Sequence, residues 1–501
     1  MTKLQAILNH TWFFPLLILY YGIAYVFIGE VYYLNEGFSM DGIVFSSFVS
    51  IDNFQRSYFF DTYYVHRIFP SLVVGIFFKI FSISITNANI VTGFQVLNAV
   101  SIALTCYYIK RILILLKVSF KNQLMAMLLF VLSFSVIKIP YFLPALTDTV
   151  AIVLSTAMLF FYLKKNTTGL VVCTILACFT WQMLFYQGII LIAIPFMVLP
   201  YSKFKPATKI AIQSASALIA LIVCLYEIIV VKAEIQVELV AKINRTLLPL
   251  SIGGVVILLY FFSGIVLNSS LFNIRLFFQK LKLKNIIVAA LTIVLTTYIV
   301  YVLHPAPNKF YPMSNMLTGT VASALIWPLH MLVSHISYWG IVVILLIFFW
   351  NDFSKFISQM GWGLVFAFGL NLFTFGIICE TRCLANLLPW IIIFLAKAIN
   401  KHSFSNAFYI TIACLSIFAS KIWYPLNPSK KYKYFMQLDE NGSMGFPDQK
   451  LWMHVGPWMS EKMYLIQGAG IILIIILLFF ILYRVEFSKE KKLEFVAKYK
   501  K

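Results

Sequence analysis

The feature that most constrains this chain is a succession of long apolar runs, which begins near residue 12 and continues almost to the C-terminus. Runs of this length are typical of helices that cross a lipid bilayer. Charged residues make up only 11% of the sequence, whereas soluble proteins carry roughly 25%. The chain therefore lacks the polar surface of a soluble, disordered or fibrous protein, and we expect an all-α polytopic membrane protein.

We place fifteen apolar segments along the chain, at 12–28, 69–84, 91–109, 123–139, 149–163, 169–182, 184–199, 210–230, 246–267, 286–303, 336–350, 360–379, 385–398, 407–423 and 464–483. Fifteen simple crossings conflict with the positive-inside rule, because the basic loop 110–121 would then lie outside. Segment 69–84 is short and contains Pro70 and Lys79, which favours a helix in the plane of the outer leaflet. The other fourteen segments then alternate as transmembrane helices.

This topology places both termini in the cytoplasm, including a basic tail at 484–501. The predicted cytoplasmic loops are 110–122, 164–168, 200–209, 268–285, 351–359 and 399–406. The long outer pieces are a first loop, 29–90, which contains the in-plane helix 69–84, and the loops 304–335 and 424–463. None of these pieces is long enough for a separate enzyme domain, so we expect residues 1–501 to form a single membrane domain.

The net charge of +21 has three possible explanations: an anionic substrate path, a nucleic-acid surface or the ordinary positive-inside bias. In the predicted topology nearly all of the excess lies on the cytoplasmic side, so no nucleic-acid partner is required. The seven cysteines lie in or at the ends of apolar runs. They lack the spacing of a zinc site or a disulfide framework.

Acidic residues are scarce, and the first outer loop contains five of them, Glu30, Glu36, Asp41, Asp52 and Asp61. Asp41 follows the first span by about a dozen residues. A carboxylate at the membrane surface can remove the proton of a hydroxyl group during group transfer. Asp41 is therefore a candidate catalytic base, and the alternative is that the acids only keep this loop soluble.

Three further outer positions carry groups suited to an anionic substrate. His66 and Arg67 open the in-plane helix, and an arginine fork there fits a phosphate or serves as an interfacial anchor. Asp148 stands at the mouth of the span 149–163. It either caps that helix or faces a substrate cavity as a second acid.

Glu380 and Arg382 lie in a very short outer turn between two spans. An ionisable pair with so little loop around it is a candidate functional site. The pair either forms a salt bridge that fixes the two helices, or Arg382 binds a lipid phosphate while Glu380 orients its guanidinium.

The outer loop 304–335 begins with polar and aromatic residues, among them His304, Lys309 and Tyr311. We expect this loop to close over a bound glycan or lipid headgroup. Its three histidines are spaced too irregularly for a zinc site, and no metal site is predicted. The sequence contains no phosphate-binding loop, dinucleotide fingerprint or nucleophile elbow, so nucleotide and serine hydrolysis lack support.

These features together resemble the GT-C class of integral-membrane glycosyltransferases, in particular the enzymes that use polyprenyl-phosphate sugars. The similar features are an acid soon after the first span, Asp41, and a run from Tyr63 to Ser71 that introduces the in-plane helix. Two spans joined by a basic loop follow, and Asp148 is a second acid at the mouth of the next helix. The resemblance is specific over about residues 10–165.

The resemblance implies a GT-C-like helix bundle with a cavity that opens to the outer face and sideways to lipid. The site positions that it implies are Asp41 and Asp148 as catalytic residues, Arg67, Arg382 and His66 as ligands of the donor phosphate, and Glu380, His304, Lys309 and Tyr311 as supporting residues. No cofactor is expected. A divalent metal is in doubt, because neither Asp41 nor Asp148 has a second acid close by in the sequence.

The implied activity is that of an inverting glycosyltransferase in a bacterial plasma membrane. It would move a sugar from a polyprenyl-phosphate donor to a glycan, a glycolipid or a cell-envelope polymer, with membrane lipids as further partners. The Trp-Trp-Asp signature of oligosaccharyltransferases is absent, which argues against peptide glycosylation. The alternatives are an O-antigen polymerase or ligase, a lipid or polysaccharide transporter and a structural subunit. The near absence of ionisable residues deep in the spans counts against ion-coupled transport.

Overall fold

The computed structural model describes residues 7–32, 37, 38, 40–50, 62–229, 242–303, 313–426, 437, 438, 444, 445 and 456–482. The first helices along the chain are α2 (Phe13–Ile28), α3 (Met40–Ser47), α4 (Thr62–Val65), α5 (Phe69–Ile80), α6 (Asn87–Leu115), α7 (Phe120–Val131), α8 (Phe134–Ile137), α9 (Ile139–Phe142), α10 (Asp148–Leu163), α11 (Thr167–Cys178) and α12 (Gln182–Ala193). In this half, each predicted span and the predicted in-plane segment coincide with a helix or with a pair of helices.

The helices of the second half are α13 (Pro206–Ile229), α15 (Leu248–Phe262), η3 (Ser263–Val266), η4 (Ser269–Phe272), α16 (Ile274–Lys280), α17 (Leu283–Leu303), α18 (Met313–Leu325), α19 (His330–Trp339), α20 (Ile341–Phe348), α21 (Trp350–Gln359), α22 (Trp362–Phe375), η5 (Thr381–Leu387), α23 (Leu388–Ile399), α24 (Asn406–Ala419), η7 (Gly456–Trp458) and α25 (Glu461–Phe480). One short antiparallel pairing joins β1 (Gln437–Leu438) to β2 (Met444–Gly445). The described chain is otherwise helices and connecting segments.

Six of the described helices are long and apolar enough to cross a membrane, and the number is nine if each of three bent helix pairs counts as one span. Seven more apolar helices contain 10–17 residues. These helices are those expected of a multi-pass membrane protein. The count of fourteen crossings and the cytoplasmic position of both termini stay predictions.

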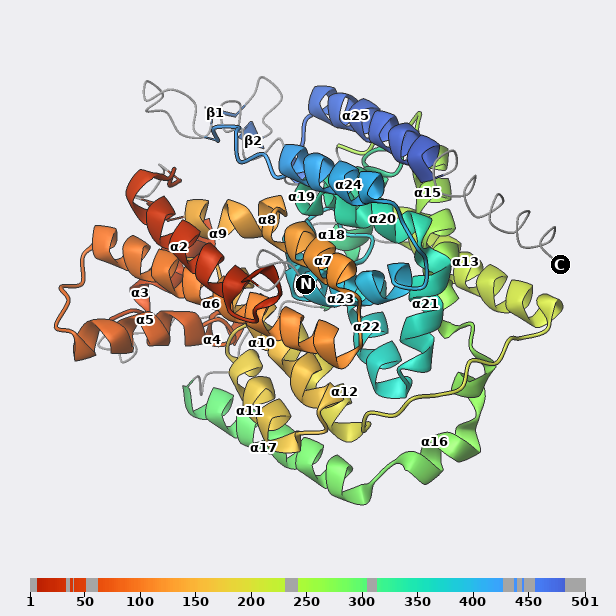
Figure 1. The fold of residues 1–501 in the computed structure, drawn as a ribbon, viewed down its shortest axis with the longest axis horizontal. Coiled ribbons are helices and arrows are strands. Elements are labelled where there is room, and N and C mark those ends of the chain that lie inside the picture. The colour runs from red at the N-terminus through yellow and green to blue at the C-terminus, as the bar shows by residue number, and fades with distance from the viewer. Residues whose placement is uncertain are drawn as a thin grey trace.

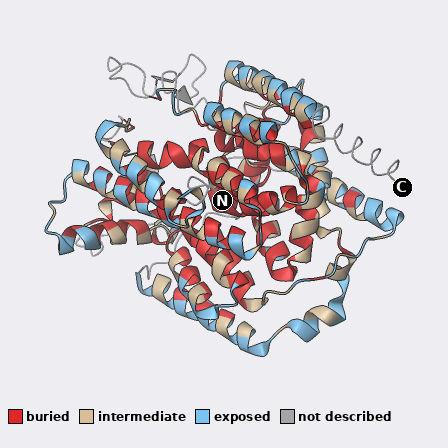
Figure 2. Ribbon diagram, viewed as in Figure 1, coloured by how far each residue is buried: buried red, intermediate tan, exposed pale blue. Residues whose placement is uncertain are grey.

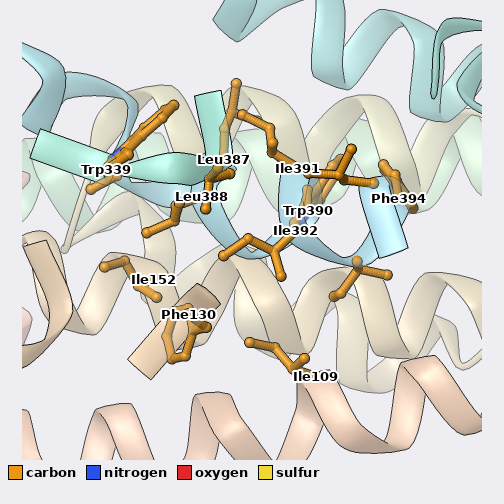
Figure 3. Packing of buried hydrophobic residues seen from close by; sticks show 14 of the residues in the cluster. Ile109, Phe130, Ile152, Trp339, Leu387, Leu388, Trp390, Ile391, Ile392 and Phe394 are labelled. Carbon is orange, nitrogen blue, oxygen red and sulfur yellow. The ribbon is translucent and has the colours of Figure 1, made fainter. Parts of the chain in front are cut away.

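Helix α23 lies at the centre of the bundle. Trp390 and the apolar residues that follow it on α23 are buried, and they pack against Ile109 of α6, Phe130 of α7 and Ile152 of α10 (Figure 3). Because α23 is covered on all sides, its apolar residues lie against protein rather than lipid.

Helices α13, α17 and α25 lie at the periphery, with α25 and α17 on opposite edges of the view (Figure 1). Their surfaces are largely exposed, in contrast to the buried centre (Figure 2). On α17 the side chains of Leu291 and Val294 are 62% and 65% exposed. Apolar surface of this extent is unfavourable in water and suits contact with lipid tails.

Two predicted spans are broken in the structure. The span 123–139 forms α7 and then the short pair α8 and α9, with a bend of 62°. The span 336–350 divides at Gly340, whose φ of 73° ends α19 and begins α20. A bend of 82° then separates α20 from α21. Apolar composition alone does not reveal such bends, because hydrophobicity continues through them.

Much of the predicted outer loop 304–335 is helical, since α18 and the start of α19 occupy its described part. These helices meet at 94°. The Ser323 hydroxyl donates to the carbonyl of Thr320 at 2.9 Å and accepts from the backbone N–H of Cys379 at 3.3 Å. In the described part of this predicted loop, Ser323 is therefore bonded to other residues of the protein.

Candidate functional site

Asp41 lies in the first turn of α3, and α5 fixes the position of that helix. The Ser71 hydroxyl of α5 donates to the carbonyl of Phe45 at 2.7 Å. The two segments also meet closely at Gly75, where a Cβ atom would lie only 2.4 Å from the carbonyl oxygen of Val49. A larger residue than glycine at this position would separate the helices, so α5 acts as the support that positions Asp41.

Arg382 lies between two carboxylates. Its Nε donates to Glu380, and one terminal nitrogen lies 3.8 Å from the Asp41 carboxylate. The side chains of Arg382 and Asp41 are 30% and 33% exposed, so the pair is open to a ligand. A turn after α22 has thus come together with the first predicted outer loop, more than three hundred residues earlier in the sequence.

The turn that carries Arg382 rests on a buried histidine of α19. The two ring nitrogens of His335 are bonded to the Thr381 hydroxyl at 2.9 Å and to the Gly376 carbonyl at 3.0 Å. His335 therefore connects both sides of the turn. This contact explains how a turn with little loop around it keeps a fixed conformation.

Asp148 is the first residue of α10, and the helix cap is Thr147, so the proposed capping role of Asp148 is wrong in its detail. Asp148 is 8% exposed, and neither carboxylate oxygen has a hydrogen-bond partner among the residues that the structure describes. Arg382 and Arg67 attract its negative charge, and Glu380 and Asp41 repel it. A buried carboxylate without a hydrogen bond is costly unless a ligand supplies the donor.

Arg67 approaches Asp148 from the segment between α4 and α5. One terminal nitrogen of its guanidinium donates to the Thr147 hydroxyl at 2.8 Å. The guanidinium also stacks on the rings of Trp181, at 3.7 Å from the centroid, and Tyr63, at 5.0 Å. Stacking on two rings holds the guanidinium plane in place while leaving its edge free to donate.

His66 is an anchor for this segment. Its Nδ1 lies 2.7 Å from the carbonyl of Cys178 at the end of α11, and the backbone N–H of Phe69 donates to Phe179 at 2.8 Å. Burial is the largest cause that lowers the pKa of His66 below its usual 6.5, and the nearby Arg67 lowers it further. The ring is therefore neutral at pH 7, and it adds no positive charge for a phosphate.

This pKa shift predicts a pH-dependent stability. Because the folded state takes up the His66 proton less readily than the unfolded state, the protein is expected to lose stability as the pH falls below about 6.5. A His66→Asn variant keeps an N–H donor at the position of Nδ1 for the Cys178 carbonyl but does not titrate. Thermal unfolding at pH 7.5 and pH 5 should show a larger decrease for the wild type than for the variant. Equal decreases would contradict this prediction.

A buried amide network connects the helices beneath the two arginines. The amide oxygen of Gln187 accepts from Asn371 at 3.1 Å and from Asn386 at 2.9 Å, and Asn386 also donates to Asn371. Ser155 of α10 donates to the carbonyl of Asn386, and Trp390 donates to the carbonyl of Ser155. The network therefore connects α10, which begins with Asp148, to the segment that carries Arg382.

Replacing Asn386 with alanine should destabilise the protein by about 1–3 kcal/mol, because its buried amide partners lose their hydrogen bonds. The matched control is Asn89→Ala, which removes a half-buried asparagine whose hydrogen bonds to Ser84 lie at the surface. Thermal unfolding in one detergent should show a clear loss for Asn386→Ala and a small change for the control. Equal unfolding temperatures for wild type and Asn386→Ala would contradict the prediction.

Five positions chosen from the sequence lie together in the structure. They are Asp41, Arg67, Asp148, Glu380 and Arg382. His66 lies beside them as an anchor. Three other chosen positions, His304, Lys309 and Tyr311, fall outside the described residues.

Sequence reasoning missed the contribution of Trp181 and Thr147. The sequence indicated a span through 169–182, whereas the structure ends α11 at Cys178 and begins α12 at Gln182, so Trp181 lies in the turn. The predicted spans 169–182 and 184–199 are separated by a single residue, and this close spacing could have indicated a tight turn near Trp181. Thr147 stands directly before Asp148, and its role as a partner of Arg67 follows only from the fold.

The site contains oppositely charged groups and no cluster that favours a metal. Within the described residues, no group of three His, Cys, Asp or Glu side chains is arranged to hold a metal ion. Arg67 and Arg382 suit an anionic group such as a phosphate, and the carboxylates of Asp41 and Asp148 suit a hydroxyl group. One site can therefore bind a phosphate and a hydroxyl group together.

Comparisons of this chain with protein-family models, with curated proteins and with solved structures found no match.

Proposed function

We propose that this protein is an inverting glycosyltransferase that uses a sugar linked to a polyprenyl phosphate. The observation that carries the proposal is the meeting of two arginines with three carboxylates. Of these, Asp41 is partly exposed, and Asp148 is buried with no hydrogen-bond partner among the described residues. The substrate that fits such a site is a phosphate ester together with a hydroxyl acceptor. The predicted topology places this site at the outer face of the plasma membrane.

Both arginines keep hydrogen-bond donors for a phosphate. Arg382 uses Nε and one terminal nitrogen in its contacts with described residues, and Arg67 uses one terminal nitrogen. Each guanidinium carries five N–H donors in a planar fork. The remaining donors of Arg67 and Arg382 can therefore bind the oxygens of one phosphate from two sides.

Asp41 is positioned to act as the general base. The acceptor oxygen attacks the anomeric carbon of the sugar while Asp41 takes the acceptor proton. The bond between that carbon and the phosphate oxygen breaks, and its electron pair stays with the polyprenyl phosphate. This step needs no cofactor, because Asp41 takes the proton, the acceptor takes the sugar and the polyprenyl phosphate leaves with the electron pair.

The Arg382 contact couples proton transfer to departure of the phosphate. During the reaction the phosphate gains a negative charge as its ester to the sugar breaks, and Asp41 loses its charge as it is protonated. Once Asp41 is neutral, it attracts the Arg382 guanidinium less strongly. The guanidinium can then stabilise the negative charge that develops on the phosphate. The buried carboxylate of Asp148, which has no hydrogen-bond partner among the described residues, accepts a hydrogen bond from a second hydroxyl of the acceptor and orients the acceptor.

The decisive experiment is a transfer assay with the purified protein in lipid nanodiscs. Mass spectrometry of envelope glycans from cells with and without the gene identifies the missing sugar and its acceptor. Synthetic polyprenyl-phosphate esters of that sugar are then offered with the acceptor. Transfer with inversion at the anomeric carbon is expected. An unchanged glycan in the deletion strain, with no transfer from any donor, would contradict the proposal.

An O-antigen polymerase or ligase is the second candidate, because the same two arginines would hold a lipid-linked glycan by its phosphate. Such an enzyme is expected to depend on the arginines and to need no carboxylate base. An Asp41→Asn variant therefore distinguishes the two candidates. Retained activity with a lipid-linked glycan would favour the polymerase or ligase.

A further inference from the structure

A polar cavity lies away from the two arginines, in and beside the predicted cytoplasmic segments 200–209, 268–285 and 351–359. Its volume is about 520 Å³, and it lies between the start of α13, the end of α15 with η3, and α21. Three lysines line it, Lys203, Lys209 and Lys355. The proposed glycosyl transfer makes no use of this cavity.

The cavity is cationic without a compensating acid. None of the described residues that line it is acidic, and its three lysines form no ion pair with a described residue. Asp352 on α21 is the acid nearest in sequence, and its carboxylate is bonded to Lys401 at 3.2 Å and to His402 at 3.0 Å. The lysine charges therefore act together on whatever enters the cavity.

The wall that carries Lys203 is fixed by the buried side chain of Asn268. Its amide oxygen accepts from the backbone N–H of Ser202 at 2.9 Å, and its amide nitrogen donates to the carbonyl of Pro200 at 3.2 Å. The backbone N–H of Leu199 donates to Gln359 at the end of α21, at 2.8 Å. Because the extended segment 199–203 is held from two sides, this wall of the cavity has a fixed position.

The cavity combines charge with an apolar floor. Phe261 and Trp350 line it, with their rings stacked at 4.9 Å, and Trp350 donates to the carbonyl of Phe261. The adjacent α13 exposes the apolar side chains of Leu218, Ile219 and Ile222. A site with cations at its mouth and lipid-facing apolar residues beside it suits an amphipathic phosphate ester.

We propose that this cavity binds a phosphate group, either on the headgroup of an anionic membrane lipid or free in solution. The lysine ammonium groups bind the phosphate oxygens, and Asn351 and Ser354, which also line the cavity, supply further hydrogen-bonding groups. Basic pockets between membrane helices suit lipid headgroups of this kind. The site is independent of the glycosyl transfer and is tested without it.

The test compares a cavity variant with a matched charge control. The cavity variant carries Lys203→Gln, Lys209→Gln and Lys355→Gln, and the control carries Lys280→Gln, Lys282→Gln and Lys284→Gln, three exposed lysines outside the cavity. Both lose the same charge. One arm measures binding of phosphatidylglycerol and of phosphatidylcholine by native mass spectrometry. The other measures thermal stabilisation by inorganic phosphate.

The cavity variant should bind phosphatidylglycerol about a hundredfold more weakly than the control, at about fivefold for each lysine. Such a loss, with no effect of inorganic phosphate, identifies a lipid headgroup as the ligand. Stabilisation by inorganic phosphate that the cavity variant lacks identifies a free phosphate. Equal behaviour of wild type, cavity variant and control in both arms overturns the proposal. A single Lys355→Gln variant, expected to lose about fivefold, applies the same criterion if the triple variant fails to fold.

Discussion

Replacing Asp41 with asparagine is expected to lower the rate of sugar transfer by at least about a hundredfold, because a general base typically contributes that much to the rate. Asparagine has nearly the same shape as aspartate, so it fits beside Arg382 at this position of α3. It cannot, however, take the acceptor proton. The rate is measured under saturating donor and acceptor in nanodiscs. The melting temperature should stay close to that of the wild type, because the lost contact is partly exposed.

The matched control is Asp352→Asn, which changes an acid paired with Lys401 and His402 outside the candidate site. This variant should transfer sugar at the wild-type rate. An Asp148→Asn variant tests the second acid in the same assay, and we expect a raised KM for the acceptor with a smaller loss of rate. Wild-type transfer by Asp41→Asn would show that Asp41 is not the base.

Replacing Arg382 with glutamine should change both stability and donor binding. The free energy of unfolding should fall by about 2 kcal/mol, because Glu380 loses a charged hydrogen bond and Asp148 loses its largest favourable charge. The KM for the lipid-linked donor should rise at least about tenfold, as one charged hydrogen bond to the phosphate is lost. Thermal unfolding and donor titration measure the two effects.

An Arg382→Lys variant separates the charge of this residue from its shape. Lysine keeps the positive charge near Glu380 and Asp41 but lacks the planar fork. We expect it to restore most of the stability and little of the donor affinity. If the lysine variant matched the wild-type KM, Arg382 would act as a point charge, and two-sided binding of the phosphate would be contradicted.

Most helices were predictable because apolar runs locate them directly. The run 149–163 corresponds to α10, which begins one residue earlier, and 407–423 corresponds to α24. The breaks were not predictable from hydrophobicity. Leu329 has a φ of 54° directly before α19, at a bend between two helices where the sequence predicts an outer loop. At this break the carbonyls of Ile326 and Pro328 accept hydrogen bonds from the Asn244 backbone N–H and the Tyr464 hydroxyl, which lie far away in the sequence.

The charged residues of the candidate site were predictable because so few charges occur at the outer ends of the predicted spans. Asp41, Asp148 and Arg382 stood out against apolar surroundings. Their supporting groups were not predictable in the same way. His335 holds the turn of Arg382 through Thr381, and an isolated histidine in a polar stretch gives no sign of such a contact. Contacts of this kind depend on packing between distant helices.

The break between α18 and α19 has a consequence for the order in which the protein is assembled in the membrane. The carbonyl of Pro328 accepts a hydrogen bond from the Tyr464 hydroxyl of α25 at 2.6 Å, and Trp327 stacks on the same tyrosine. Half-helices of this length are too short to be inserted as ordinary spans. They acquire these partners only after α25 has left the ribosome, and a chain truncated before α25 would leave the break without them.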